Sequence, residues 1–250
     1  HFTGLASNRP PGQTRGMTEA TLHFPIAEYQ RRIAKTRKAM QARGLDLILV
    51  SDPSNMEWLT GYNGWSFYVH QAVLLGLEGE PVWWGRGMDA NGARRTAFMG
   101  HDNIAGYPDH YVQSTERHPM EHLSRLIADR GWKDALIGLE MDNYWFSAKA
   151  HTTLLKAFKP NNLQDATGLV NWQRSVKSDL EIGFIRRAAK IVDAMHARVF
   201  ELVEPGLPKN VLVAEIQKQS ILGADGNWGD YAAFVPMAPS GMDATAPHLT

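Results

Sequence analysis

The sequence predicts an α/β fold of two domains, and two observations support this prediction. Helix and strand patterns alternate between Thr21 and Ala166, in the order helix, strands, helix, strand and helix, which is typical of an α/β layer domain. From Ser178 onward, the longest stretch of helical periodicity follows. We therefore expect an amino-terminal domain over 17–168, a linker over 169–177 and a second domain over 178–250.

The first segments predict a leader, a helix and a buried strand. Residues 1–16 are polar, rich in Gly and Pro and aperiodic, which indicates a disordered leader or an extension. Pro25 opens an amphipathic helix that Gly44 ends. The continuous apolar run LDLILV, 45–50, predicts a strand that is covered on both faces. The turn SDPSN, 51–55, is typical of the cap of a short helix.

Turn residues divide the remainder of the first domain. Gly79 lies between two apolar runs and predicts a turn between strands, whereas Gly131 and Pro160 are typical of positions just after helices. We expect strands at 70–77, 81–86 and 102–107, a helix at 119–130, a strand at 135–141 and a helix at 147–158.

The second domain begins with a capping box formed by Ser178 and Glu181. Apolar residues then recur at helical spacing as far as Pro205, and a second helix is expected from about Lys209 to Leu222. The residues beyond it have loop and short-strand character, and 231–235 has no evident strand partner. We therefore interpret 178–250 as the first part of a domain.

The composition excludes several classes of function. Lys and Arg number 26 against 26 Asp and Glu, so the formal charge of zero argues against a nucleic acid or anionic membrane partner. The sequence contains no cysteine, which excludes disulfides, thiol nucleophiles and cysteine-ligated metal sites. The longest apolar runs are too short to span a bilayer, and no signal peptide pattern is evident. We expect a soluble, cytoplasmic protein with a small-molecule or protein partner.

The linker and long helix resemble the signature that opens the catalytic domain of the creatinase / Xaa-Pro peptidase ("pita-bread") superfamily. The residues that carry this resemblance are Arg174, Lys177, Ser178, Glu181, Ile182, Ile185, Arg186 and Ala188, followed by Glu204-Pro205-Gly206. One departure is Lys209-Asn210, where relatives more often have an acidic residue. The resemblance implies a creatinase-type amino-terminal α/β domain followed by the first part of a pita-bread catalytic domain.

Within this superfamily, the amino-terminal strings resemble those of members that hydrolyse a C–N bond of a small cyclic amidine without a metal. The strings are SDPSNMEWLTGYNGWSFYVHQAVLL, GMDANGARRT, IAGYPDHYVQSTERHPM and LEMDNYWFSAKAHTTL. Three alternatives stay open: a metal-dependent Xaa-Pro dipeptidase or aminopeptidase, a metal-free enzyme acting on creatine, and a non-catalytic dimerisation or binding module.

The segment SGMDATAPHLT matches the superfamily segment that carries a catalytic histidine, which implies that His248 is the general acid/base. An imidazole titrates near neutral pH, so it is suited to take a proton from water and return it to a leaving nitrogen. The alternative is a solvated histidine. The resemblance implies that carboxylates from a further carboxy-terminal segment assist this histidine, so we expect the 250 residues alone to be nearly inactive.

The loop 61–70 concentrates aromatic residues between turn glycines. In dimers of the superfamily, the corresponding loop reaches over the partner's active site, which implies a homodimer with Trp65 and Phe67 as a substrate lid. Aromatic faces suit a delocalised amidinium, and each such contact is worth about 0.5–2 kcal/mol. The alternative is that both aromatic side chains belong to the core.

No metal or nucleotide site is expected from the residues present. His118 and His122 lie four residues apart on a helix, but they lack a third ligand and the His-Glu-x-x-His order, so we expect a solvated helix face. The segment with Gly85 and Gly87 breaks the dinucleotide fingerprint at Ala90. We therefore expect no cofactor.

Overall fold

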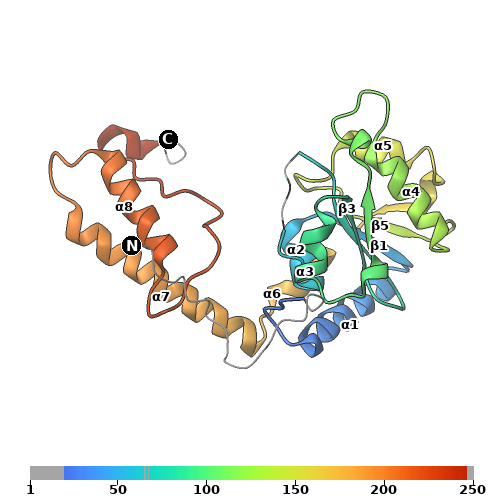
Figure 1. Cartoon of the computed structure of the whole chain (residues 1–250), viewed down its shortest axis with the longest axis horizontal. Coiled ribbons are helices and arrows are strands. Elements are labelled where there is room, and N and C mark those ends of the chain that lie inside the picture. Colours follow the sequence, from blue (N-terminus) through green and yellow to red (C-terminus); the bar gives the residue numbers. More distant parts are fainter. Residues whose placement is uncertain (1–19, 65, 67, 247–250) are drawn as a thin grey trace. The chain divides into compact units, whose positions relative to one another are not determined.

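The computed structural model describes residues 20–64, 66 and 68–246. The chain divides into two compact units, His1–Val176 and Lys177–Thr250, and each is described by itself below (Figure 1). Among the described residues, no helix combines the length and apolar character needed to cross a bilayer.

The first unit is built on one six-stranded sheet with the order β4-β3-β2-β1-β5-β6. Its strands are β1 (Leu47–Val50), β2 (Ala72–Gly76), β3 (Val82–Arg86), β4 (Ile104–Tyr107), β5 (Ile137–Leu139) and β6 (Leu163–Asp165). Strand β2 runs antiparallel to both of its neighbours, and the other pairings are parallel. The carboxyl ends of β1, β3, β4, β5 and β6 therefore meet at one edge of the sheet, where β2 begins.

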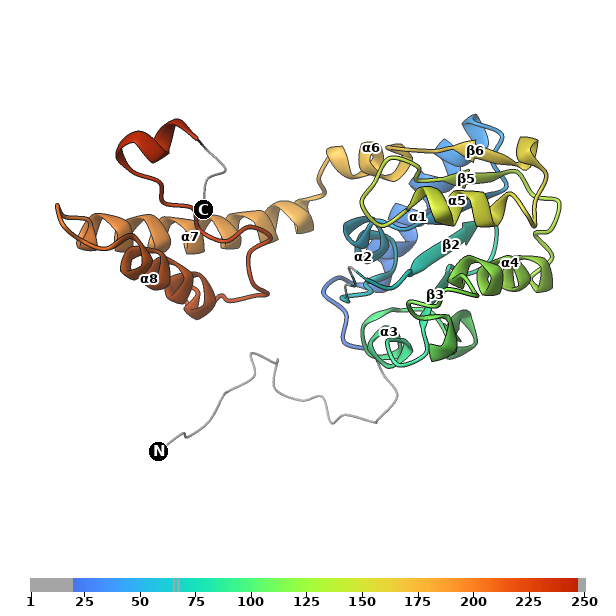
Figure 2. The same ribbon diagram turned by 90° about the horizontal axis from the view of Figure 1, so that it is seen from above.

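Helices cover both faces of this sheet (Figures 1 and 2). Core residues of α1 (Ile26–Ala42), α2 (Pro53–Thr60), α3 (Ala90–Thr96) and α6 (Leu169–Ser175) pack on one face, and those of α4 (Pro119–Asp129) and α5 (Ala148–Leu154) pack on the other. All four residues of β1 are buried, with alternate side chains in the two cores. The prediction of a strand covered on both faces is confirmed.

Several local predictions are also confirmed. Helix α1 follows Pro25, α4 begins at Pro119, and the Asp52 carboxylate caps α2 by accepting a hydrogen bond from the backbone N–H of Asn55 at 3.0 Å. A short polar residue is favoured at this position because its side chain satisfies an N–H group that has no partner within the helix.

Two α-helices and one strand were not expected from the sequence: α3, α6 and β6. Helix α6 lies in the segment that we expected to be a linker. It follows Gly168, whose φ of 77° suits glycine, and it buries Leu169 and Val170 in the same core as α1 and α2. Tertiary burial therefore stabilises a seven-residue helix that is too short to be stable by its own propensity.

The second unit contains α7 (Asp179–Leu202), α8 (Lys209–Leu222) and the short 3-10 helix η4 (Gly241–Thr245). The predicted capping box at the start of α7 is confirmed, with the Ser178 and Glu181 side chains each bonded to the other's backbone N–H. Arg198 of α7 donates to Glu215 of α8 at 2.9 Å. Among the described residues of this unit, large apolar side chains are mostly partly or fully exposed.

Candidate functional site

The carboxyl edge of the sheet gathers the loops that carry polar and aromatic side chains. Ser51 follows β1, Arg86 ends β3 and Glu140 follows β5, while the loop 61–70 leads from α2 into the start of β2. In open α/β sheets, ligands bind outside the carboxyl ends of parallel strands, because the strands there direct several loops toward one place. This edge is therefore the candidate site of the first unit.

A buried carboxylate lies beneath the edge. Glu140 is 2% exposed, and its Oε2 accepts hydrogen bonds from the backbone N–H groups of Ser51 at 2.8 Å and Asp52 at 2.9 Å. Its Oε1 accepts a hydrogen bond from Asn55 Nδ2 at 2.6 Å. Burial raises the pKa of Glu140, and these three donors oppose the rise because they stabilise the ionised form. The carboxylate thereby fixes the turn between β1 and α2.

The same network reaches helix α6. Asn55 Nδ2 also donates to Asn171 Oδ1 at 3.0 Å, and Arg174 Nη1 donates to Asn55 Oδ1 at 2.6 Å. One amide side chain thus joins the carboxylate of the β5 end to two residues of α6. The network runs from the buried Glu140 to the exposed Asn171, and because its members satisfy one another it rigidifies the elements that it connects.

The base of the loop 61–70 is held by a buried tyrosine. Tyr62 donates from its hydroxyl to Gln71 Oε1 at 2.9 Å, and its ring lies 5.2 Å from that of Trp83. Burial raises the pKa of Tyr62, so the phenol remains a hydrogen-bond donor. Within the described part of the chain, the buried Nε2 of Gln71 has no acceptor, which leaves a hydrogen-bond donor beside the loop.

The outer part of the loop is tied to strands β3 and β4. Arg86 binds Asp109 through two hydrogen bonds of 2.8 and 3.1 Å and donates to the Tyr68 hydroxyl at 3.2 Å. The hydrogen bonds from Arg86 lower the pKa of Asp109. Tyr107 donates from its hydroxyl to the backbone oxygen of His70 at 2.8 Å. These contacts fix the loop at its second end.

The three residues assigned to catalysis and substrate binding from the sequence all lie outside the described residues. Trp65 and Phe67 belong to the loop whose two ends are held as above, and His248 follows η4. Between the two aromatic residues, Ser66 is buried and accepts a hydrogen bond from the backbone N–H of Val69 at 3.1 Å. Their roles stay predictions.

His118 and His122 have structural partners, so the expectation of a solvated helix face is wrong. His118 caps α4 by accepting from Met120 N at 3.2 Å, and His122 Nδ1 accepts from Trp84 Nε1 at 3.1 Å. Both rings are partly buried. In the described ranges, no three His, Cys, Asp or Glu side chains form a group that could hold a metal ion.

The His118 ring lies 4.9 Å from that of His70, a pairing that the sequence did not indicate. Burial and the neighbouring imidazole lower the pKa of His118 to about 4, so the ring is neutral at physiological pH. Neutrality matters for the helix, because a protonated Nδ1 could not accept the capping hydrogen bond.

Comparison with known proteins adds to this geometry. Residues 32–176 match the model of the "Creatinase/Prolidase N-terminal domain" family. The chain is 55% identical over 240 residues to the ectoine hydrolase of Halomonas elongata, covering 94% of this chain and 60% of that protein. It is 35% identical to an uncharacterized hydrolase/peptidase of Sinorhizobium fredii, covering 91% of this chain and 58% of that protein. The chain thus spans about three fifths of the length of these curated relatives.

Solved structures share the fold. A recombinant prolidase from Thermococcus sibiricus matches with a TM-score of 0.71 and 20% identity, over 89% of this chain and 56% of that one. An Xaa-Pro dipeptidase from Bacillus anthracis matches with a TM-score of 0.60 and 17% identity, over 76% of this chain and 48% of that one. At these identities the likeness concerns the fold, and the predicted α/β class is confirmed.

Proposed function

The chain belongs to the creatinase/prolidase family. From this premise we propose that the protein to which this chain belongs hydrolyses ectoine. The observation that supports this substrate is the identity of 55% over 240 residues to the ectoine hydrolase of Halomonas elongata. The matched span covers 94% of the chain and so extends well beyond the amino-terminal domain. We infer a hydrolase that acts on a C–N bond of a cyclic amidine.

The reaction opens the ring of ectoine by addition of water. Water attacks the amidine carbon, a tetrahedral intermediate forms, and the bond from this carbon to one ring nitrogen breaks, which gives N-acetyl-2,4-diaminobutyrate. His248 takes a proton from the attacking water and returns it to the leaving nitrogen. No metal takes part in this proposal, and carboxylates hold the amidinium and stabilise the intermediate.

The loop 61–70 supplies the substrate contacts in this proposal. Trp65 and Phe67 place aromatic faces against the delocalised amidinium, whose positive charge is attracted to the ring faces. The described ends of this loop are anchored, by Tyr62 on one side and by Arg86 and Tyr107 on the other. We further propose a homodimer in the cytoplasm, in which the loop of one subunit serves the active site of the other.

A metal-dependent Xaa-Pro dipeptidase is the second candidate, because solved prolidases and dipeptidases share the fold. It ranks below the first candidate, since these proteins are 20% identical or less. Manganese-dependent cleavage of an Xaa-Pro dipeptide would identify it.

The proposal is tested by incubating the purified protein with ectoine and following the reaction by proton NMR. The methyl signal of the amidine is expected to decline while an acetamide methyl signal grows, at a rate that a chelator leaves unchanged. Absence of turnover in a protein that extends to the full length of the relatives would contradict the proposal. The expectation that the 250 residues alone turn over little ectoine is tested in the same assay.

A further inference from the structure

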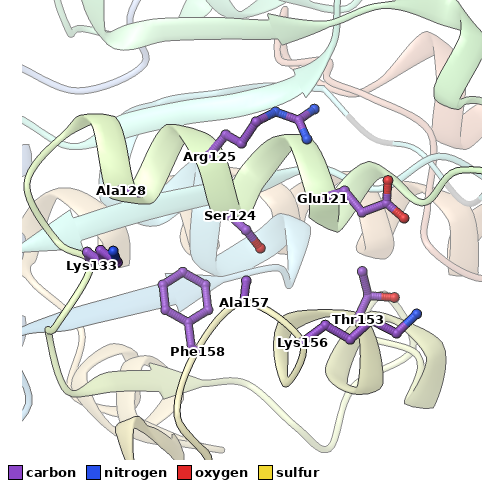
Figure 3. A pocket seen from close by; sticks show the side chains of 9 residues that line it. All are labelled: Glu121, Ser124, Arg125, Ala128, Lys133, Thr153, Lys156, Ala157 and Phe158. Atoms are coloured by element: carbon purple, nitrogen blue, oxygen red, sulfur yellow. The ribbon is translucent and has the colours of Figure 1, made fainter.

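A cavity of about 360 Å³ lies between α4 and α5 of the first unit, on the face of the sheet that these two helices cover (Figure 3). Small side chains surround it: Ser124 and Ala128 on α4, with Thr153 and Ala157 on α5 and the turn that follows. Ser124 and Ala128 are four residues apart and so lie on one face of α4, opposite Thr153 of α5 and Ala157 of the following turn. The buried ring of Phe158 lines the middle of the cavity (Figure 3).

Charged groups lie at both ends of this cavity. In Figure 3, Lys133 lies at one end, while Lys156 and Glu121 lie at the other. Neither ammonium group has a hydrogen-bond or ion-pair partner among the residues that the structure describes. Glu121 Oε1 accepts from the backbone N–H of His118 at 3.3 Å, as part of the capping box of α4.

The hydroxyl groups of the cavity act as acceptors. Ser124 Oγ donates its hydrogen to the backbone oxygen of Met120 at 2.7 Å, and Thr153 Oγ1 donates to that of Lys149 at 2.8 Å. Each hydroxyl has a single hydrogen, so only lone pairs remain for a ligand. The cavity therefore offers acceptors at Glu121 and the hydroxyls, cationic donors at its two ends, and an apolar surface on Phe158.

We propose that this cavity binds an acidic amino acid. Its α-ammonium group lies at Glu121, its α-carboxylate at Lys156, its side-chain carboxylate at Lys133, and its methylene groups against Phe158. The volume lies within the range of about 300–1,000 Å³ that small-molecule sites occupy. Two lysines and one carboxylate flank the cavity, whereas the Arg125 guanidinium is directed to the Tyr111 hydroxyl, and the remaining excess of one positive charge favours a ligand with a net negative charge.

This proposal does not depend on the hydrolytic function and is tested on the 250-residue chain. Isothermal titration with L-glutamate and L-aspartate is expected to give saturable binding of at least one of them. Lys133→Met and Lys156→Met are each expected to weaken it about ten-fold, the effect of losing one charge-assisted hydrogen bond. Lys38→Met, at an exposed position of α1, is the matched control and is expected to leave the affinity unchanged.

Two further experiments, a comparison of ligands and a variant that fills the cavity, identify the class of ligand. Glutarate lacks the ammonium group and L-glutamine lacks the second carboxylate, so each is expected to bind more weakly than L-glutamate. Ser124→Leu fills the cavity and is expected to abolish binding, with circular dichroism reporting whether it folds. The proposal is overturned if neither amino acid binds saturably, if both lysine variants bind as the parent does, or if glutarate binds as tightly as L-glutamate.

Discussion

Asn55 donates a hydrogen bond of 2.6 Å from Nδ2 to Oε1 of Glu140, which lies 85 residues later in the chain. The Oδ1 atom of the same Asn55 side chain accepts a hydrogen bond from Arg174, so this one side chain connects the end of β5 with helix α6. This contact is the centre of the polar network beneath the carboxyl edge.

The network predicts a large stability cost for Glu140→Gln. The substitution places an NH₂ group where two backbone N–H groups and an amide now donate, so at least one buried donor loses its acceptor. We expect the free energy of unfolding to fall by about 1–3 kcal/mol, measured by urea denaturation. Glu116→Gln, at an exposed carboxylate, is the control and should change it by less than about 0.5 kcal/mol. Equal effects of the two variants would show that the network adds no stability.

The backbone conformation of Gly61, at the start of the loop 61–70, predicts a loss of stability when a side chain is added there. Its φ is 81°, and a Cβ there would lie 2.9 Å from both the Thr96 backbone oxygen and the Tyr29 hydroxyl. Gly61→Ala is therefore expected to cost about 2–3 kcal/mol, from backbone strain and from crowding. Gly79→Ala has a similar φ of 72° but open space around the added methyl group, so about 1 kcal/mol is expected. Thermal unfolding compares the two, and a similar loss in both would exclude a contribution from crowding.

His118 predicts a dependence of stability on pH. Its folded-state pKa is about 4, below the ordinary 6.5, so the unfolded chain binds the proton more readily. The stability that the neutral His118 ring contributes to the folded state is fully present above about pH 6.5 and is lost as the pH falls toward 4. After allowance for partial exposure, we expect a loss of about 1–2 kcal/mol over this range. His70, Glu121, Lys149 and Lys156 are the charged or titratable groups that act on this ring.

The variant His118→Asn separates this titration from the helix cap. Asparagine is a favourable cap residue and has no proton to gain, so the variant should keep α4 and lose part of the pH dependence. Urea denaturation of both proteins across this pH range measures the difference. Parallel pH profiles for the parent and the variant would contradict the assignment.

The aromatic loop predicts a change in substrate affinity. Trp65→Ala and Phe67→Ala, each made in the active enzyme, are expected to raise KM for ectoine by about 2- to 30-fold. This range corresponds to the loss of one cation–π contact worth about 0.5–2 kcal/mol. Trp65→Phe and Phe67→Tyr keep an aromatic face and should retain most of the affinity. Steady-state kinetics provide the measurement, and an unchanged KM in the alanine variants would remove both residues from the substrate site.

The main elements of the fold were predictable because local periodicity and turn residues specify them. Helix α1 and strand β1 follow directly from the pattern between Pro25 and Val50. Glu140 was not predicted as an anchor, because a carboxylate after a strand has no distinctive local pattern. Its role arises from the parallel register of β1 and β5, which aligns Leu49 with Leu139 and brings the turn after β1 to the carboxylate.

Some site features depend on partners that are distant in sequence. The partly buried His118 packs against His70, which lies at the end of the loop 61–70, just before β2. The cavity between α4 and α5 likewise depends on small residues of two separate helices meeting across one space. Neither arrangement is encoded in a motif of either segment, although Pro119 at the first helical position was a local signal for the start of α4.

The most direct test of the proposed mechanism is the rate of ectoine hydrolysis after His248→Ala in the protein that carries this residue. Loss of a general acid/base is expected to lower kcat by about 10²- to 10⁴-fold, while the parent rate is unaffected by a chelator. A variant that consumes ectoine at the parent rate would contradict the assignment of His248 to proton transfer.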